Sequence, residues 1–301
     1  MKRGLIAWDR EALPPAVFDA RLAKVRAALI ERDLPAVVVY SDVWRANPAR
    51  FLTNFMPYWN RSLVVIPREG GPVLLCGLSP RVYPWIRSVT VFEDIRPASK
   101  LAQSLLQLCD ERGWKRLGVM DWLVLPNEVD SQLTGLERVN LPSGGLFDSD
   151  EADLAMRSRA AALARRILER EIASGSGGTD YELAGRLERE LRREGAEDLA
   201  ILFSTAGRIP FPAHGAILRD RYSLVLALEY MGHWVKIARA HAPTAELDAL
   251  RSHFLSVLPT GEGRIEHPDG DAFGVRGRLF VLTVDLDGLY YGDTCYEGPL
   301  L

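Results

Sequence analysis

Cysteine, lysine and long apolar runs are all scarce in this sequence of 301 residues. The three cysteines, Cys76, Cys109 and Cys295, lie far apart and none belongs to a CxxC pair, which argues against zinc-ribbon, redox and disulfide sites. No apolar run approaches the roughly 20 residues that span a bilayer, and the N-terminus lacks the apolar core of a signal peptide. We therefore expect a cytoplasmic protein that does not associate with membranes.

A long block of charge of one sign is also lacking. The formal net charge is -3, because 37 Lys and Arg residues are nearly balanced by 40 interleaved Asp and Glu residues. Binding to nucleic acid depends on a basic patch, so we expect no nucleic-acid partner. With 48% hydrophobic residues, the chain is long enough to bury a sizeable core and to form two domains.

The first half of the chain alternates between patterns typical of helices and strands. Apolar residues recur at helical spacing from Pro15, and the β-branched run AVVVY follows, which predicts a helix and then a buried strand. Further strands are expected at SLVVIPR, GPVLLCG, SVTVFED and RLGVMDW, with a helix at LAQSLLQLCDERG. This order predicts an α/β domain over residues 1–145.

The second half, residues 146–301, follows the linker PSGGLFDSD and reads as an α+β domain. Asp148 or Ser149 can cap a long amphipathic helix, EADLAMRSRAAALARRILEREIA, and a second helix begins after the break SGSGG. From Leu199 onward the pattern is mostly that of strands, with a helix-like stretch at ELDALRSHFLSVL. The segment DLDG is expected to form a hairpin turn rather than a calcium loop, because it lacks the ligand spacing of such a loop.

Lysine is the rare cation of this chain: only five residues are lysines, and Lys236 is the only one after Lys115. It stands in HWVKIARAH, whose composition predicts a buried strand. A buried ammonium is costly unless it is paired, so we expect a partner; the alternative is that the side chain reaches solvent at a strand edge. Strand alternation places Lys236 on one face and His233, Arg239 and His241 on the other, which we expect to be exposed unless the histidines line a site.

Several motifs, in this order, resemble the creatinase and prolidase (aminopeptidase P) family. NPARFLTNFMPYWNRSLVVI is similar to that family's segment around a YLTGF-like motif, and the two helices joined through G-T-D-Y-E-L-A are similar to its helix pair. FSTAGRIPFPAHGAILRDRYSLVLALEYMGHWVKIAR is similar to its Pro/His motif, strand and hairpin ending in G-Y-x-x-D-x-x-R. The resemblance covers most of the chain and implies a creatinase-type α/β domain followed by a pita-bread α+β domain with a shortened C-terminal part.

The sequence departs from the resembling family at the metal-binding positions. Family peptidases bind two metals through two aspartates, one histidine and two glutamates, because hard divalent cations need several converging oxygen ligands. Here Lys236 stands in place of the second aspartate and Val225 near the first, and Ile265 replaces the histidine. Asp285 and Gly292 stand at the two glutamates. We therefore expect no metal site and no cofactor.

The resemblance also implies a role for His214 in FPAHGA. Creatinase hydrolyses a C–N bond without metal, with such a histidine as the proton carrier, and imidazole can both accept and donate near neutrality; the alternative is a loop histidine bonded to backbone. We hypothesise that Lys236 sits where a metal would be and pairs with Asp285, and additionally with Asp293. The catalytic candidates are thus His214, Lys236 and Asp285, and the substrate-binding candidates are Tyr58, Trp59, Arg61, Glu229, Arg239 and Asp293.

Two functions remain open from the sequence. One is a metal-independent, creatinase-like enzyme that hydrolyses or cleaves a C–N bond in a small molecule. The other is a catalytically silent pseudo-peptidase that binds a small molecule or pairs with an active homologue, and a metal-dependent Xaa-Pro peptidase ranks third. Family members commonly pair so that first-domain residues approach the partner's cleft, so we expect a homodimer to which Tyr58, Trp59 and Arg61 contribute; ordinary core packing of these aromatics is the alternative.

Overall fold

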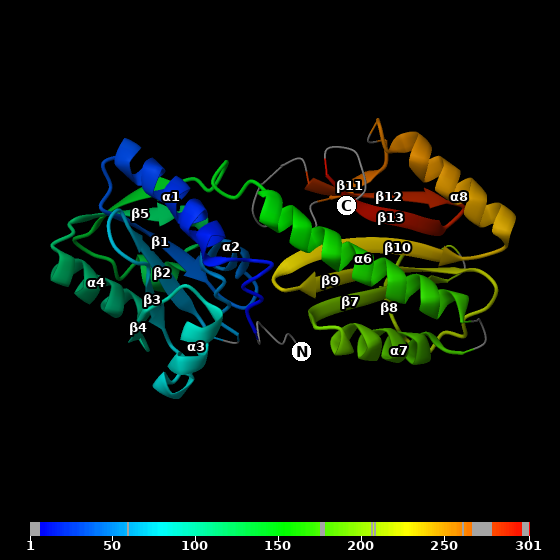
Figure 1. Cartoon of the computed structure of the whole chain (residues 1–301), viewed down its shortest axis with the longest axis horizontal. Coiled ribbons are helices and arrows are strands. Elements are labelled where there is room, and N and C mark those ends of the chain that lie inside the picture. The colour runs from blue at the N-terminus through cyan, green and yellow to red at the C-terminus, as the bar shows by residue number, and fades with distance from the viewer. Residues whose placement is uncertain are drawn as a thin grey trace. The chain divides into compact units, whose positions relative to one another are not determined.

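The computed structural model describes residues 7–58, 60–174, 178–205, 207, 209–260, 262–266, 279–296 and 301. The chain divides into two compact units, the first made of residues 3–148 and the second chiefly of residues 149–301. Each unit is built around its own β-sheet (Figure 1). Within the described residues, the helices are all too short or too polar to cross a membrane.

The first unit is a mixed α/β sheet with helices on both faces. Its strand order is β4-β3-β2-β1-β5-β6, and β2 runs antiparallel to both of its neighbours while the other pairs are parallel. Its helices, strands and two 3₁₀ helices (η) are α1 (Pro15–Glu31), β1 (Ala36–Ser41), α2 (Asn47–Thr53), β2 (Ser62–Pro67), β3 (Val73–Cys76), η1 (Pro80–Val82), α3 (Tyr83–Val89), β4 (Asp94–Pro97), α4 (Leu101–Arg112), β5 (Arg116–Met120), η2 (Trp122–Val124), α5 (Asn127–Asp130) and β6 (Glu137–Leu141).

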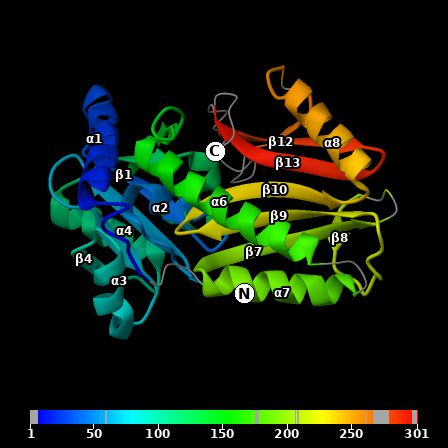
Figure 2. The same ribbon diagram turned by 45° about the vertical axis from the view of Figure 1, so that its right-hand side comes forward.

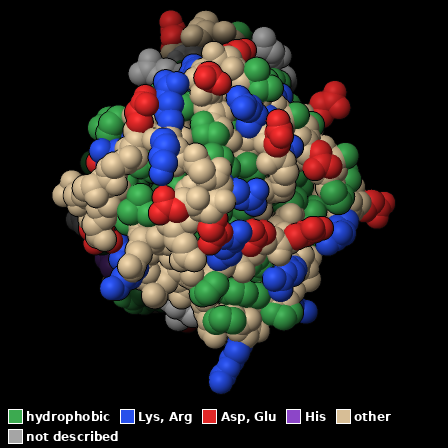
Figure 3. Space-filling model, turned by 90° about the vertical axis from the view of Figure 1, so that its left-hand side faces the viewer, with side chains coloured by type: hydrophobic (Ala, Val, Ile, Leu, Met, Phe, Trp, Pro, Cys, Tyr) green, Lys and Arg blue, Asp and Glu red, His purple; other side chains and the backbone are tan. Residues whose placement is uncertain are grey.

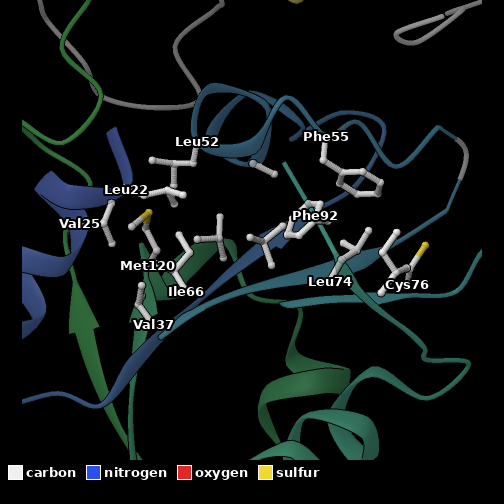
Figure 4. Close-up of a cluster of buried hydrophobic side chains, with 14 of the residues drawn as sticks. Leu22, Val25, Val37, Leu52, Phe55, Ile66, Leu74, Cys76, Phe92 and Met120 are labelled. Atoms are coloured by element: carbon white, nitrogen blue, oxygen red, sulfur yellow. The ribbon is translucent and has the colours of Figure 1, made fainter. Parts of the chain in front are cut away.

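Strand β1 explains why AVVVY shows no alternation between apolar and polar residues. Val37 and Val39 pack into one core cluster, which α1 and α2 cover (Figure 4), while Val38 and Tyr40 pack into a second cluster against α4. A strand of a mostly parallel sheet is buried on both faces, so every side chain is apolar. The predicted helix and strand at the start of the chain are confirmed.

The predicted strand at SVTVFED is wrong. Helix α3 continues to Val89, and the strand β4 begins only at Asp94. The Thr90 hydroxyl donates to the carbonyl of Ile86 at 2.8 Å, and the amide of Val91 donates to the carbonyl of Thr53 at 3.2 Å. The β-branched residues therefore end a helix and pack against α2 instead of entering the sheet, so tertiary contacts outweigh their strand propensity.

The described part of the second unit is an antiparallel sheet curled into a half-barrel, with three helices on one face (Figures 1 and 2). The strand order is β11-β12-β13-β10-β9-β7-β8. Its elements are α6 (Glu151–Ala173), α7 (Asp180–Arg193), β7 (Ala196–Thr205), β8 (Phe211–Pro212), β9 (Tyr222–Tyr230), β10 (His233–His241), α8 (Thr244–Val257), β11 (Arg264–Glu266), β12 (Leu279–Leu286) and β13 (Leu289–Tyr296).

Local signals in the sequence account for the ends of these elements. Helix α6 is capped by Asp150, whose carboxylate accepts from the Asp153 amide at 2.8 Å, so neither Asp148 nor Ser149 is the cap. Helix α7 begins with a capping box in which Thr179 and Glu182 exchange bonds. The predicted hairpin turn at DLDG is confirmed, because β12 and β13 are joined by Asp287 and Gly288, both with positive φ.

The face of the molecule shown in Figure 3 carries basic and acidic side chains interspersed with one another. No continuous area of one charge stands out on that face. The expectation that nucleic acid is not a partner stays a prediction.

Candidate functional site

The two faces of the second sheet have different surroundings. Helices α6, α7 and α8 pack on one face through apolar residues such as Leu226 and Ile237 on β9 and β10 and Leu282 on β12. Ile265 is paired with Leu282 and so belongs to this same side of the sheet. Alternation along the strands turns the other matched positions to the opposite face, which none of the three helices covers: Lys236, Val225, Asp285 and Gly292. We call this opposite face the open face.

Cross-strand pairing brings several of the matched positions into one row on the open face. Val225 on β9 is paired with Ala238 on β10, and Ala238 is paired with Gly292 on β13. In the other direction Val225 is paired with Leu202 on β7, which is paired with Pro212 on the edge strand β8. The loop that carries His214 therefore leaves the sheet at the end of the row that contains Val225 and Gly292.

Lys236 lies in the neighbouring row and forms an ion pair with Glu266 on β11. Its backbone amide donates to the Thr294 hydroxyl at 2.9 Å, and that hydroxyl donates to the Lys236 carbonyl at 3.0 Å. Pairing continues this row from Thr294 to Val281 and from Val281 to Glu266. Thr294 and Val281, which lie between Lys236 and Glu266 in this row, are both fully buried. The ion pair therefore lies above these two residues.

The predicted partner of Lys236 is wrong. Asp285 lies two rows away toward the β12–β13 turn, and one row is about 7 Å along a strand. It is exposed, and its Oδ1 accepts from the backbone amide of Gly288 at 2.8 Å. The carboxylate therefore stabilises the turn. The second predicted partner, Asp293, alternates to the helix-covered face.

Arg239 and Asp293 belong to a buried ion-pair network under α6. Asp293 accepts from Arg239 at 2.9 Å and from two nitrogens of Arg165 at 2.9 and 3.0 Å, and Arg239 also reaches Glu169 at 3.0 Å. Burial acts to lower the pKa of Arg239, but the Asp293 carboxylate beside it raises that pKa. This network joins α6 to β10 and β13. Both residues lie on the wrong face to share a substrate with Lys236, so this corrects their predicted binding role.

The two histidines of β10 also lie on the helix-covered face, and His233 is buried rather than exposed. Its Nε2 is 3.3 Å from Asp153 on α6, and its Nδ1 is 2.8 Å from the carbonyl of Met231. His241 stacks on Tyr222 with ring centroids 5.1 Å apart. His233 and His241 lie opposite Lys236 as expected, but helices pack on this face of the sheet and it is not exposed to solvent.

Glu229 is a fully buried carboxylate on the open face. It is paired with Trp234 across β9 and β10, one row from Lys236. The structure therefore brings Glu229 and Lys236 to the same face of the same hairpin. Glu229 remains a candidate for substrate binding.

His214 follows β8 in a loop that Asp180 anchors. The Asp180 carboxylate accepts from the backbone amides of His214 and Gly215 at 3.0 and 2.8 Å, and it lies 3.3 Å from Nδ1 of the His214 ring. Burial acts to raise the pKa of Asp180, but the backbone donors of this loop lower it. The His214 side chain is 47% exposed and touches the edge of Phe211 at a centroid distance of 6.0 Å.

Three of the predicted binding residues belong to the first unit. Tyr58 has a positive φ of 60° and packs edge-on against Trp85 at 5.4 Å. Arg61 forms an exposed ion pair with Glu128. Trp59 lies outside the described residues.

The positions matched to metal ligands do not fit a pair of metal ions. Val225 is apolar, Lys236 brings a positive charge, and Ile265 is an exposed apolar residue. A Cβ on Gly292 would lie 2.8 Å from the backbone oxygen of Leu282, so this position has no room for a longer side chain. Across the described parts of the chain, no group of three or more His, Cys, Asp or Glu side chains is placed to hold a metal ion.

Comparisons with known proteins identify the fold. A scan against protein-family models found no match, and a search of curated protein sequences found none. Among solved structures, an Xaa-Pro dipeptidase from Bacillus anthracis superposes with a TM-score of 0.67 and 15% identity, covering 93% of this chain and 96% of that chain. An X-Pro aminopeptidase from Thermotoga maritima MSB8 gives 0.70 and 13%, covering 91% and 93%. A prolidase from Pyrococcus horikoshii OT3 gives 0.68 and 12%, covering 92% and 95%.

The chain has the fold of these peptidases. The expected creatinase-type first domain and pita-bread second domain agree with the mixed sheet and the curled antiparallel sheet described above. At these identities the likeness shows the fold alone.

Two residues of the site were missed by the sequence analysis. Glu266 directly follows Ile265, which stands in place of the family's metal-binding histidine, and this position was the signal for it. Asp180 is the acid of the G-T-D-Y-E-L-A turn, and its place at the start of α7 was the only signal. Both make long-range contacts that local patterns do not reveal.

Proposed function

We propose that this protein is a metal-independent enzyme that hydrolyses or cleaves a C–N bond in a small molecule, with His214 as the acid and base. The observation that carries the proposal is the half-exposed His214 ring, held by Asp180 at the end of the row that contains Val225 and Gly292. A positioned imidazole that reaches solvent can take a proton from an attacking water and later give it to the leaving nitrogen. Such a step contributes about 10²–10⁴-fold to a rate.

Lys236 supports this chemistry as an electrostatic group. An ammonium on the open face stabilises the negative charge that develops on oxygen when water adds to a carbonyl carbon. Glu266 is its partner and limits the net charge of the pair. Glu229, buried one row away on the same face, adds a negative charge that favours a positively charged group of the substrate nearby.

The fold and the site support a choice of substrates to test. The similar structures are an Xaa-Pro dipeptidase, an X-Pro aminopeptidase and a prolidase, and a peptide bond is one kind of C–N bond. Short Xaa-Pro peptides and guanidino or amidino acids are therefore the substrates to test first. A metal-dependent peptidase is the least supported function, because Lys236 and Gly292 stand where oxygen ligands would be needed.

A silent binding protein is the second candidate, and one observation favours it. Lys236 is already paired with Glu266, so its charge is partly satisfied without a substrate. In that case the open face binds a small molecule, or the chain pairs with an active homologue, without turnover.

The decisive experiment is a turnover and binding screen with purified protein in the presence of a metal chelator. The panel contains Xaa-Pro dipeptides and guanidino and amidino acids, and it compares the wild type with His214→Ala and with the control His253→Ala on α8. The proposal expects chelator-resistant turnover that His214→Ala abolishes and His253→Ala leaves unchanged. Binding without turnover supports the silent protein, and turnover that requires an added divalent metal overturns both.

A further inference from the structure

The ring of His214 is oriented through one of its two nitrogens. Nδ1 lies 3.3 Å from an Asp180 carboxylate oxygen and 3.3 Å from the carbonyl oxygen of Pro212. Both neighbours are acceptors in this environment, so Nδ1 must carry the proton to bond with either. In the neutral ring, Nε2 then holds a free lone pair.

The surroundings of Asp180 favour its ionised form. Its side chain is completely buried, and its carboxylate accepts hydrogen bonds from the backbone amides of His214 and Gly215 and faces Nδ1 of His214. The pKa of Asp180 is lowered by these donors in spite of burial. Asp180 is also the first residue of α7, where the helix dipole favours a negative charge. A carboxylate held in this way orients the imidazole and does not take its proton.

The backbone completes the anchor on both sides of the loop. The Asp180 amide donates to the Ala216 carbonyl at 2.9 Å, and the Leu218 amide donates to the Gly178 carbonyl at 2.9 Å. Gly215 has a positive φ of 89°, and a Cβ at this position would lie 3.4 Å from the ring of Tyr181, the second residue of α7. The loop around His214 is thus tied to the start of α7, which fixes where its ring can lie.

The other histidines of the described chain are arranged differently. His233 is buried with an acceptor at each ring nitrogen, and His241 is stacked on Tyr222. His253 lies on α8, which packs on the helix-covered face. His214 combines a ring nitrogen held by a buried carboxylate with a side chain that is about half exposed.

We propose that Asp180 is the positioning residue of the site: it holds His214 as the Nδ1–H tautomer and so makes Nε2 the atom that exchanges protons with a substrate. The proposal rests on the proposed function for the use of Nε2. The tautomer itself is a property of the protein alone and can be measured without any substrate.

The test uses full-length protein labelled with ¹⁵N at histidine, with the His214 ring assigned by its loss in His214→Gln. Long-range ¹H–¹⁵N spectra above neutral pH report which ring nitrogen carries the proton. We expect a protonated Nδ1 and an unprotonated Nε2 for His214 in the wild type. A wild-type spectrum with the proton on Nε2 overturns the proposal whether or not any variant folds.

Asp180→Asn then tests the cause, because an amide can donate to Nδ1 and so favours the opposite tautomer. The matched control is Glu182→Gln, which removes one charge from the same helix turn but does not contact His214. We expect the proton to move to Nε2 in Asp180→Asn and to stay on Nδ1 in the control. An unchanged tautomer in folded Asp180→Asn overturns the role of Asp180.

Activity separates this inference from the proposed function. If a substrate is found, Asp180→Asn should lower kcat by about 10²–10⁴-fold with little change in KM, as expected for loss of a general base rather than of binding. A normal kcat in Asp180→Asn with a displaced tautomer overturns the use of Nε2 in catalysis. If no substrate is turned over, the proposed function fails, but the spectra still decide the tautomer.

Discussion

Lys236 on β10 forms an ion pair with Glu266 on β11, although β13 and β12 lie between these strands in the sheet. A flat sheet would separate β10 from β11 by about 14 Å, three spacings of about 4.8 Å. The contact therefore requires the sheet to curl toward its open face. The same curl brings Gly288, at the tip of the β12–β13 hairpin, against Gly207 after β7, where a Cβ on Gly288 would lie only 2.3 Å from the Gly207 Cα.

This pair predicts how substitutions at position 236 change stability. Both side chains are about one quarter exposed, so removal of the ammonium takes a positive charge away from the partly buried carboxylate of Glu266. Lys236→Ala should lower the free energy of unfolding by about 1–3 kcal/mol, and Lys236→Met by less, because the methionine keeps the apolar stem over Val281 and Thr294. Chemical denaturation measures both.

Lys115→Ala is the matched control for the lysine. Its side chain is 81% exposed and its ammonium is 3.8 Å from Asp110, so its removal should change stability by no more than about 0.5 kcal/mol. If Lys236→Ala is as mild as Lys115→Ala, the side chain is solvated and the ion pair does not stabilise the curl.

Self-association is expected to involve one end of the first sheet, where strands β1 and β5 finish. Trp44 follows β1 and Leu123 follows β5, two parallel neighbours, and the two residues are 87% and 102% exposed. Tyr58 and Arg61 precede β2, whose start is paired with the end of β1. Exposed apolar side chains at one end of a sheet favour contact with another chain. We expect light scattering to give twice the 33.5 kDa mass of one chain.

Trp44→Ser should shift this equilibrium toward the monomer. Leu255→Ser is the control, because Leu255 is a similarly exposed apolar residue on α8, at 59% exposure. A monomer at micromolar concentration for the wild type would refute the expected dimer, whereas equal weakening by both variants would refute the contact at Trp44.

Acid should destabilise the protein through Asp153. This carboxylate is buried between Arg157, at 2.9 Å, and His233, at 3.3 Å. Burial acts to raise the pKa of Asp153, but the charge of Arg157 and then that of His233 lower it below its usual range. A depressed folded pKa gives stability that is present above the unfolded pKa of about 3.9 and is lost as the pH falls toward the folded value.

Asp153→Asn removes this dependence. The variant should lose about 3–5 kcal/mol at pH 7, because Arg157 then lacks its buried counter-charge, and its stability should fall less steeply than that of the wild type below about pH 4. Asp248→Asn on the exposed face of α8 serves as the control. Parallel pH profiles for the wild type and Asp153→Asn would contradict this account.

The sequence predicted the fold better than it predicted the site. Helices α6 and α7 and strands β9 and β10 follow from periodicity and caps, which are local, and the order of motifs pointed to the pita-bread architecture. The partner of Lys236 could not be found in this way, because Glu266 reaches it through the curl of the sheet and not through spacing along the chain. Asp285 was predicted because it stands at the place of a metal-binding glutamate in the resembling family, but the β12–β13 register places it two rows from Lys236.

The sequence predicted which residues of β10 share a face of the second sheet, but it did not predict which face the helices cover. Alternation correctly separated Lys236 from Arg239 and His233. Which face the helices cover depends on long-range packing, such as the Arg157 guanidinium reaching the Trp234 carbonyl at 2.6 Å. The buried network around Asp293 follows from that packing.

Substitution of glycine by alanine should have opposite effects on stability at Gly292, where β12 and β13 approach closely, and at Gly185 in α7. A Cβ on Gly292 would lie 2.7 Å from the Thr283 Oγ1 and 2.8 Å from the Leu282 carbonyl oxygen, so Gly292→Ala must push the strands apart and should cost about 1–3 kcal/mol. Gly185, inside α7, has open space around its Cβ position, so Gly185→Ala should stabilise by about 0.5–1 kcal/mol. Adding Thr283→Ala to Gly292→Ala removes the hydroxyl overlap but not the backbone one, so it should recover only part of the loss. Thermal unfolding of the three variants decides the matter: if Gly292→Ala is as stable as Gly185→Ala, position 292 has room for a side chain and could present a metal-binding glutamate after all.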